Sequence, residues 1–185
     1  MKNSEKQGNR RIGKWMIFSA WLLGFAMLMI YFNYFLNKEQ NPNQSVYSRV
    51  DKSGVTEVVL KRNRYGHYVT SGKMNGVNVQ FLLDTGATDV AIPLYVADRL
   101  SLPRGPERRY STANGMVTAY STILDSVSIG PIQVNNVRAS INPGLKGREV
   151  LLGMSVLKRI EFTQRGDSLI LRPFTNDQRR QNYNQ

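Results

Sequence analysis

The chain of 185 residues carries a formal net charge of +12, with 25 Lys and Arg against 13 Asp and Glu. It has no cysteine and a single histidine, His67, which excludes disulfides, thiolate nucleophiles and clustered-histidine zinc sites. One histidine also leaves little room for a Ser-His-Asp triad. Any catalytic chemistry must therefore come from carboxylates, and we expect no metal and no cofactor.

Five basic residues precede the first apolar segment, and the basic residues beyond it are scattered rather than clustered. A nucleic-acid-binding protein would show a basic patch or stripe. We therefore interpret the positive charge as solvated basic surface and expect no nucleic-acid partner.

The first predicted element is a transmembrane helix over residues 15–36. The run from Trp15 to Phe35 contains no charged residue, and as a helix it matches the roughly 30 Å hydrocarbon core of a bilayer. A buried core helix would not need to be apolar on all sides, and a cleaved signal peptide would carry a shorter apolar run with a small-residue cleavage site. Residues 1–14 are basic, which favours a cytoplasmic N-terminus and export of the remainder.

Beyond the predicted span, the sequence indicates a tether, one domain and a tail. Residues 37–54 are predicted as a polar linker, 55–172 as an all-β domain and 173–185 as a disordered tail. Asn-Gly pairs at 75–76 and 114–115 predict two hairpins, because both residues tolerate the positive φ of a type I′ turn. Further turns are predicted at 130–131, 135–136 and 165–167, and short helices at 94–100 and 154–159.

The candidate catalytic motif is Asp84-Thr85-Gly86-Ala87, directly after the apolar run Phe81-Leu82-Leu83. This pattern places a carboxylate where a buried strand ends and a tight turn begins. The motif occurs once in the chain, whereas an aspartic protease needs two carboxylates that share one proton and one water. A single copy predicts a site built by two identical subunits. The alternative is an aspartate that only caps a turn.

With these residues the chain resembles the retroviral-type, or retropepsin-like, aspartic proteases, most closely the membrane-anchored bacterial branch. The resemblance covers roughly residues 66 to 172. Three elements match in order: the Asp84 motif continuing to Thr88, a hairpin with its tip near Ala113-Asn114-Gly115, and Leu151-Leu152-Gly153 before a short helix. The implied fold is a single-lobe, closed acid-protease β-barrel with one or two short helices, in addition to the N-terminal transmembrane helix.

The resemblance also implies roles for these residues. Asp84 pairs with its symmetry mate, Thr85 hydrogen-bonds across the dimer, and Gly86, Ala87 and Thr88 complete the loop. Retroviral enzymes commonly have an acidic residue where Thr88 stands. Ala113, Asn114 and Gly115 form the tip of a flap that closes over a bound peptide, and Leu151, Leu152 and Gly153 form a structural loop behind the site. The terminal segments 55–60 and 168–172 are the candidates for strands that interleave between subunits.

The predicted function is therefore hydrolysis of peptide bonds by a homodimer, favoured by mildly acidic pH because the pair must hold one proton. The predicted location is the bacterial inner membrane, with a single pass and a periplasmic catalytic domain. The alternative is a non-catalytic peptide-binding or dimerisation module on the same scaffold. Aspartates 89, 98, 125 and 167 are interpreted as turn or surface carboxylates, and His67 as a surface or strand-edge residue.

Overall fold

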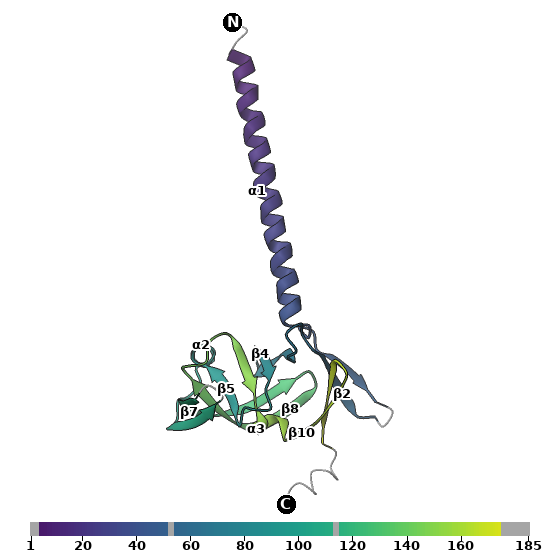
Figure 1. Cartoon of the computed structure of the whole chain (residues 1–185), viewed down its shortest axis with the longest axis vertical. Coiled ribbons are helices and arrows are strands. Elements are labelled where there is room, and N and C mark those ends of the chain that lie inside the picture. Colours follow the sequence, from purple (N-terminus) through teal and green to yellow (C-terminus); the bar gives the residue numbers. More distant parts are fainter. Residues whose placement is uncertain (1–3, 52–53, 113–114, 175–185) are drawn as a thin grey trace, which may run out of the picture. The chain divides into compact units, whose positions relative to one another are not determined.

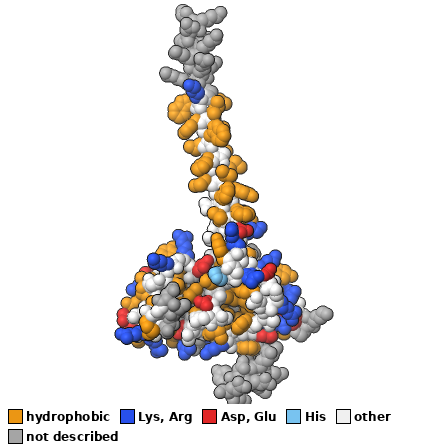
Figure 2. Space-filling view, in the orientation of Figure 1, with side chains coloured by type: hydrophobic (Ala, Val, Ile, Leu, Met, Phe, Trp, Pro, Cys, Tyr) orange, Lys and Arg blue, Asp and Glu red, His pale blue; other side chains and the backbone are white. Residues whose placement is uncertain are grey.

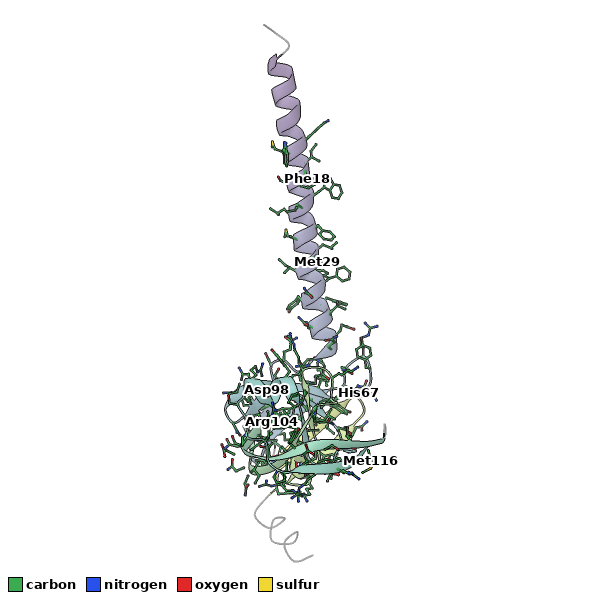
Figure 3. The ribbon with its side chains drawn as sticks, turned by 90° about the vertical axis from the view of Figure 1, so that its left-hand side faces the viewer. Phe18, Met29, His67, Asp98, Arg104 and Met116 are labelled. Atoms are coloured by element: carbon green, nitrogen blue, oxygen red, sulfur yellow. The ribbon has the colours of Figure 1, made fainter. Side chains whose placement is uncertain are left out.

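The computed structural model describes residues 4–51, 54–112 and 115–174, which fall into two compact units, Met1–Glu39 and Gln40–Gln185. Helix α1 (Ser4–Gln40) runs through the first unit, and its last residue, Gln40, belongs to the second. Its stretch Lys14–Gln40 has a mean hydropathy of 1.9 and is long and apolar enough to cross a membrane. Apolar side chains cover the face of this helix that Figure 2 shows, and Phe18 and Met29 project from it in Figure 3.

The second unit is an all-β domain built around a closed barrel (Figure 1). Seven strands form one sheet in the order β3-β4-β9-β5-β8-β7-β6, and β3 also pairs with β7, which closes the ring. The predicted all-β, single-lobe architecture is thus confirmed. The strands are β3 (Val69–Met74), β4 (Val77–Leu83), β5 (Val90–Pro93), β6 (Glu107–Thr112), β7 (Gly115–Ile129), β8 (Ile132–Asn142) and β9 (Glu149–Leu152).

Local sequence explains most of these elements. The β3–β4 hairpin turns at Asn75 and Gly76, whose φ angles are 49° and 80°, as the Asn-Gly pair predicts. Short helices α2 (Leu94–Arg99) and α3 (Met154–Leu157) occupy the two predicted helical segments. Alternating apolar residues fill the barrel, and its fully buried side chains include Phe81, Ile92, Leu124, Ile141 and Leu152.

The turn predicted at residues 135–136 is wrong, because strand β8 runs through both positions. Asn136 has a φ of 51°, and the ladder between β7 and β8 skips from the Leu124–Val137 pair to the Ser126–Asn135 pair. The Asn-Asn pair therefore produces an irregularity inside a long strand. Asparagine tolerates the left-handed conformation without ending a strand. The Asn-Asn pair was therefore compatible with a continuous strand as well as with a turn.

A second, antiparallel sheet joins the two ends of the domain in the order β1-β2-β11-β10. Its strands are β1 (Tyr47–Val50), β2 (Thr56–Lys61), β10 (Ile160–Arg165) and β11 (Ser168–Pro173). The segments predicted to interleave between subunits correspond to β2 and β11, which pair with each other within one chain. Each also has a second neighbour, β1 or β10, so the edges of this sheet are β1 and β10.

The segment predicted as a polar linker, residues 37–54, contains the end of α1, strand β1 and a buried Asn41-Pro42-Asn43 turn. Asn43 is 4% exposed. Its amide group donates to the carbonyls of Lys61 and Val69 at 2.9 and 2.7 Å and accepts the Lys61 N–H at 2.7 Å. This side chain therefore replaces missing backbone partners where β2 ends and β3 begins.

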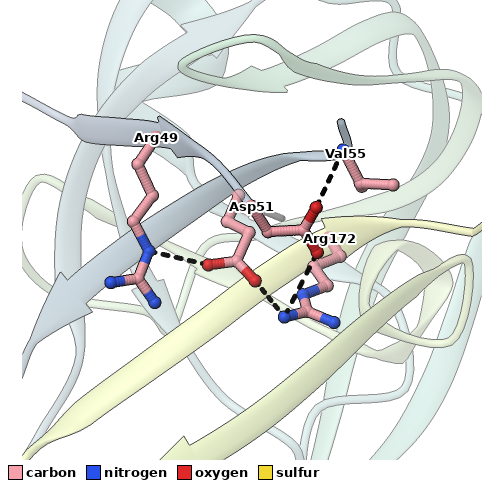
Figure 4. Close-up of polar contacts among 5 residues, drawn as sticks. Arg49, Asp51, Val55 and Arg172 are labelled. Carbon is pink, nitrogen blue, oxygen red and sulfur yellow. Dashed lines mark hydrogen bonds and ion pairs between the residues drawn. The ribbon is translucent and has the colours of Figure 1, made fainter. Parts of the chain in front are cut away.

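A buried carboxylate holds the terminal sheet together. Glu57 on β2 is 0% exposed and accepts a 2.8 Å hydrogen bond from Arg49 Nε on β1, while Arg172 on β11 pairs with its other oxygen (Figure 4). Arg172 also lies 3.7 Å from Asp51, whose carboxylate accepts the Val55 N–H. The Arg49 hydrogen bond, with support from Arg172, lowers the pKa of Glu57 below its ordinary value even though burial acts in the opposite direction.

Replacing Glu57 with glutamine is expected to lower the free energy of unfolding by about 1.5–3 kcal/mol near neutral pH, the usual range for hydrogen bonds to charged groups. The pKa of Glu57 is lowered in the folded state. The extra stability of wild type is therefore fully present at pH values above the ordinary pKa of 4.5, and it is lost as the pH falls through the folded pKa. Denaturant unfolding of both proteins across this range checks it. Glu107→Gln, on an exposed part of β6, is the matched control, and a difference that persists undiminished in strong acid would contradict the assignment.

Candidate active site

The position of Asp84 follows from the pairing of β4 with β9. These strands run parallel, with Leu83 opposite Leu152, so the residues that follow them leave the barrel at the same edge. The backbone N–H of Asp84 donates to the Leu152 carbonyl at 3.2 Å. The barrel therefore brings together two segments of the sequence motif that lie 69 residues apart, Asp84 and Gly153.

Residues 84–87 form a tight turn organised by the Asp84 side chain. Its Oδ1 accepts the Gly86 N–H at 2.9 Å, and its carbonyl accepts the Ala87 N–H at 3.3 Å. A Cβ at position 86 would lie 3.2 Å from the same Oδ1. Thr85 is exposed and Asp84 is half-buried. The turn consequently presents one carboxylate and one hydroxyl at the surface of a single chain.

Gly153 lies directly behind this turn. A Cβ at this position would lie 2.3 Å from the Asp89 carbonyl oxygen and 2.6 Å from that of Ala87. The next two backbone N–H groups, of Met154 and Ser155, donate to the carbonyls of Ala87 and Thr88 at 2.8 and 2.9 Å. The start of α3 thus holds the loop through its backbone, and a side chain at 153 would occupy the space that these bonds require.

Ser155 extends this support into the barrel. It is 5% exposed, and its Oγ accepts the Val90 N–H at 3.1 Å and donates to the Arg138 carbonyl at 2.8 Å. One hydroxyl therefore links α3 to β5 and β8. Ser155 is absent from the site predicted from sequence, where its signal is a small polar residue at the start of a short apolar helix.

The β6–β7 hairpin contains the predicted flap. Its ladder extends to the pair Thr112 and Gly115, and Gly115 has a φ of 103°. Ala113 and Asn114, predicted at the tip, lie outside the described residues. Met116, next to this end, is 67% exposed and is labelled in Figure 3. The described residues therefore form an antiparallel hairpin, and its role as a flap stays a prediction.

Asp89, which we had interpreted as a turn or surface carboxylate, is largely buried. Its side chain is 13% exposed and lies 3.5 Å from Arg138 Nη2, and the Tyr110 hydroxyl donates to it at 3.4 Å. Burial, together with the Asp89 charge, raises the pKa of Tyr110. These groups border a cavity of about 430 Å³ with apolar walls that include Pro106 and Ile123. Asp89 thus couples the loop after Asp84 to the β6–β7 hairpin.

The chemical capacity of one chain is limited by its single Asp84 loop. Within residues 4–51, 54–112 and 115–174, no group of three His, Cys, Asp or Glu side chains is placed to hold a metal ion. A half-exposed carboxylate at a rigid turn can act as a base or share a proton, but it needs a second acid to polarise a carbonyl at the same time. The described loop of one chain therefore supplies a single carboxylate, that of Asp84.

Comparison with known proteins agrees with this architecture. Residues 70–159 match a family model described as a gag-polyprotein putative aspartyl protease. A crystal structure of a retropepsin-like aspartic protease from Rickettsia conorii is 33% identical and superposes with a TM-score of 0.55, over 70% of this chain and 96% of that one. The chain belongs to the retropepsin-like aspartic protease family, as its motifs predict.

Two curated relatives are bacterial and uncharacterized. One, from a Sinorhizobium species, is 36% identical over 126 residues, which is 66% of this chain and 54% of the relative. The other, from Rickettsia prowazekii (strain Madrid E), is 36% identical over 122 residues, or 63% of this chain and 52% of the relative. The chain spans about half the length of both relatives.

Proposed function

We propose that this protein is a membrane-anchored aspartic endopeptidase in which two copies of Asp84, one from each subunit of a homodimer, activate a water molecule. The observation that carries the proposal is the placement of Asp84. It lies on an exposed, hydrogen-bonded turn at the end of a barrel strand, and α3 supports this turn from behind. Family membership supplies the reaction class.

The chemistry requires the pair. Two carboxylates side by side in an apolar cleft cannot both be ionised, so the pair retains one proton. The ionised member acts as general base on the water, while the protonated member polarises the scissile carbonyl and later helps to protonate the leaving amine. Thr85, exposed beside Asp84 in one chain, hydrogen-bonds across the twofold axis to hold the two loops. The β6–β7 hairpin closes over the peptide and excludes water.

Assembly is supported by the edges of the terminal sheet. Because β2 and β11 are paired on both sides within one chain, a second subunit adds at β1 or β10 instead of interleaving with them. Both edge strands expose apolar side chains, including Tyr47 at 63%, Val50 at 65% and Phe162 at 39%. Anchoring two copies in one membrane plane raises their effective concentration, so a weak interface suffices.

The proposed location is the inner membrane of a bacterium, with α1 spanning it once and the barrel in the periplasm. The support is the uncharged run from Trp15 to Asn37 and the basic residues that precede it. The absence of cysteine makes the fold indifferent to the redox state of its compartment.

A subunit-mixing experiment tests the shared site. Wild-type chain and Asp84→Asn chain, both full length, are co-reconstituted at constant total protein and varying ratio. If both subunits contribute Asp84, peptide hydrolysis falls with the square of the wild-type fraction, because mixed dimers are inactive. Asp98→Asn chain, altered at an exposed carboxylate on α2, serves as the diluting control and leaves hydrolysis unchanged. A linear fall with Asp84→Asn would mean that each subunit works alone, and no hydrolysis at any ratio would favour a binding module.

A further inference from the structure

One surface of the domain lies close to Gln40, the last residue of α1, because the domain begins at that residue. The apolar run ends at Leu36 and the helix ends at Gln40, which adds roughly 6 Å of helix at 1.5 Å per residue. The headgroup zone of a bilayer leaflet is about 5–8 Å thick. If α1 spans the membrane, as proposed above, Gln40 therefore lies at the outer boundary of the headgroups, and so do the residues that contact it.

The loop of residues 62–67 contacts Gln40 directly. The Asn63 side chain donates to the Gln40 carbonyl at 3.0 Å and accepts the N–H groups of Tyr65 and His67 at 3.0 and 2.9 Å. Tyr65 is 62% exposed, and the Arg64 guanidinium lies over its ring at 5.5 Å. An exposed tyrosine combined with basic side chains is the composition favoured at a membrane interface, where a ring with a polar group meets phosphates.

A basic groove of about 720 Å³ begins a few residues further along the chain. Gln44 and Val46 line it, and they follow Gln40 by four and six residues, so they lie within about 14 and 22 Å of it even in a fully extended chain. Its charged lining side chains in the described domain are Lys73, Arg99 and Arg148, with no carboxylate among them. The three cations are exposed and come from β3, α2 and the segment before β9, so the fold gathers them from distant parts of the sequence.

Figure 3 shows that residues of the loop and of α2 lie away from the β6–β7 hairpin, the predicted flap. His67, in the loop, and Asp98, which precedes Arg99 on α2, lie toward one end of the domain, whereas Met116 on the β6–β7 hairpin lies toward the other. The loop and the α2 segment next to the groove therefore lie apart from this hairpin. A partner at this end does not compete with a peptide under the flap.

We propose that loop 62–67 and the groove cations Lys73, Arg99 and Arg148 form a docking surface for the phosphate headgroups of anionic phospholipids. The hydrogen bond between Asn63 and Gln40 favours a lipid occupant over a soluble one, because it holds this loop at a residue only a few positions beyond the proposed span. Basic residues at an anionic membrane surface each contribute measurably to binding. Docking would hold the barrel in one orientation and keep the two Asp84 loops of neighbouring chains at the same height above the bilayer.

The test compares the full-length chain in nanodiscs of phosphatidylcholine with the chain in nanodiscs that also contain phosphatidylglycerol, by hydrogen exchange of backbone amides. Anionic lipid is expected to slow exchange at residues 62–67 and 73–78 at least about fivefold, the effect of one basic residue at an anionic surface, and to leave residues 115–120 at the start of β7 unchanged. The variant Arg64→Gln, Lys73→Gln, Arg148→Gln is expected to lose this difference. The matched variant Arg109→Gln, Lys158→Gln, Arg165→Gln removes as many exposed cations elsewhere and is expected to retain it.

Three results would overturn the proposal. Equal exchange in both nanodiscs would show that the surface does not sense lipid charge. Equal loss of the effect in both variants would show that only net charge matters. Equal protection by inorganic phosphate in phosphatidylcholine discs would replace the lipid by a soluble anion. Carbonate extraction separates these three results from failure of the membrane anchor. A chain that carbonate releases from membranes has no spanning helix. A chain that is retained but does not respond to lipid charge refutes the docking surface alone.

Discussion

Replacing Asp84 with asparagine is expected to reduce peptide-bond hydrolysis at least about a hundredfold, the lower range for loss of a general acid or base, and to leave the domain folded. The fold is retained because the bond that organises the turn needs only an acceptor: Asp84 Oδ1 accepts the Gly86 N–H, and an asparagine Oδ1 can do the same. Asparagine cannot accept the proton from water, so the chemistry is lost while the loop stays in place. Hydrolysis of a peptide library by full-length protein, with thermal unfolding in parallel, measures both.

The matched control for this prediction is Asp98→Asn. Asp98 is an exposed acid on α2 that pairs with Arg104 at 2.5 Å, and its replacement is expected to leave hydrolysis and unfolding nearly unchanged, as usual for a surface ion pair. A transition-state mimic with a central hydroxyl should bind wild type and lose affinity with Asp84→Asn. Undiminished turnover by Asp84→Asn would refute the proposed role, and mimic binding that ignores the replacement would favour the non-catalytic alternative.

Local signals in the sequence were sufficient for the barrel and for the Asp84 loop. The Asn75-Gly76 turn needs positive φ at both positions, and these residues supply it at little cost. The apolar run before Asp84 indicates a buried strand, and Phe81 is fully buried on β4. In both places the determinant lies within a few residues of the structure that it produces.

The remaining features depend on partners far away in the chain. Asp89 is buried because Tyr110 and Arg138, from two other strands, lie against it. Nothing within five residues of Asp89 distinguishes it from an exposed aspartate. Asn43 likewise looks like part of a polar tether until β2 and β3 supply the groups that it satisfies. A single sequence contains no signal for such contacts. It specifies the type of each side chain, but not which distant residues will pack against that side chain.

The strand order of the terminal sheet also could not be predicted from the sequence, and this order changes the proposed dimer interface. Sequence indicates that segments near 55–60 and 168–172 are strands, and both are. It does not indicate that β1 and β10 occupy their outer edges, since edge pairing depends on the hairpins at each terminus. The interface proposed for the dimer therefore moves from β2 and β11 to their neighbours, and Glu57 ties β1 and β11 to β2.

Replacing Gly153 with alanine is expected to have the second largest effect. Its φ of −88° suits any residue, so the cost comes from contact alone. The new methyl group would meet the backbone carbonyls of Asp89 at 2.3 Å and Ala87 at 2.6 Å, about 1 Å closer than ordinary contact, and neither carbonyl can rotate away as a flexible side chain can. Overpacking of this kind costs about 1–3 kcal/mol of unfolding free energy, and a displacement of about 1 Å in a catalytic loop costs on the order of a hundredfold in rate.

The control for Gly153→Ala is Gly144→Ala, in the loop before β9. A Cβ there would lie 3.3 Å from the Asn142 side-chain oxygen and 3.6 Å from a Val117 methyl group, and both neighbours are ends of side chains that can shift. Unfolding of the Gly144 variant should stay close to wild type, whereas the Gly153 variant should lose both stability and turnover. If Gly153→Ala lost stability but kept full turnover, the loop of residues 84–89 would tolerate displacement, and α3 would support the fold without positioning Asp84. Loss of turnover at retained affinity for the transition-state mimic would instead locate the damage in the alignment of the two carboxylates.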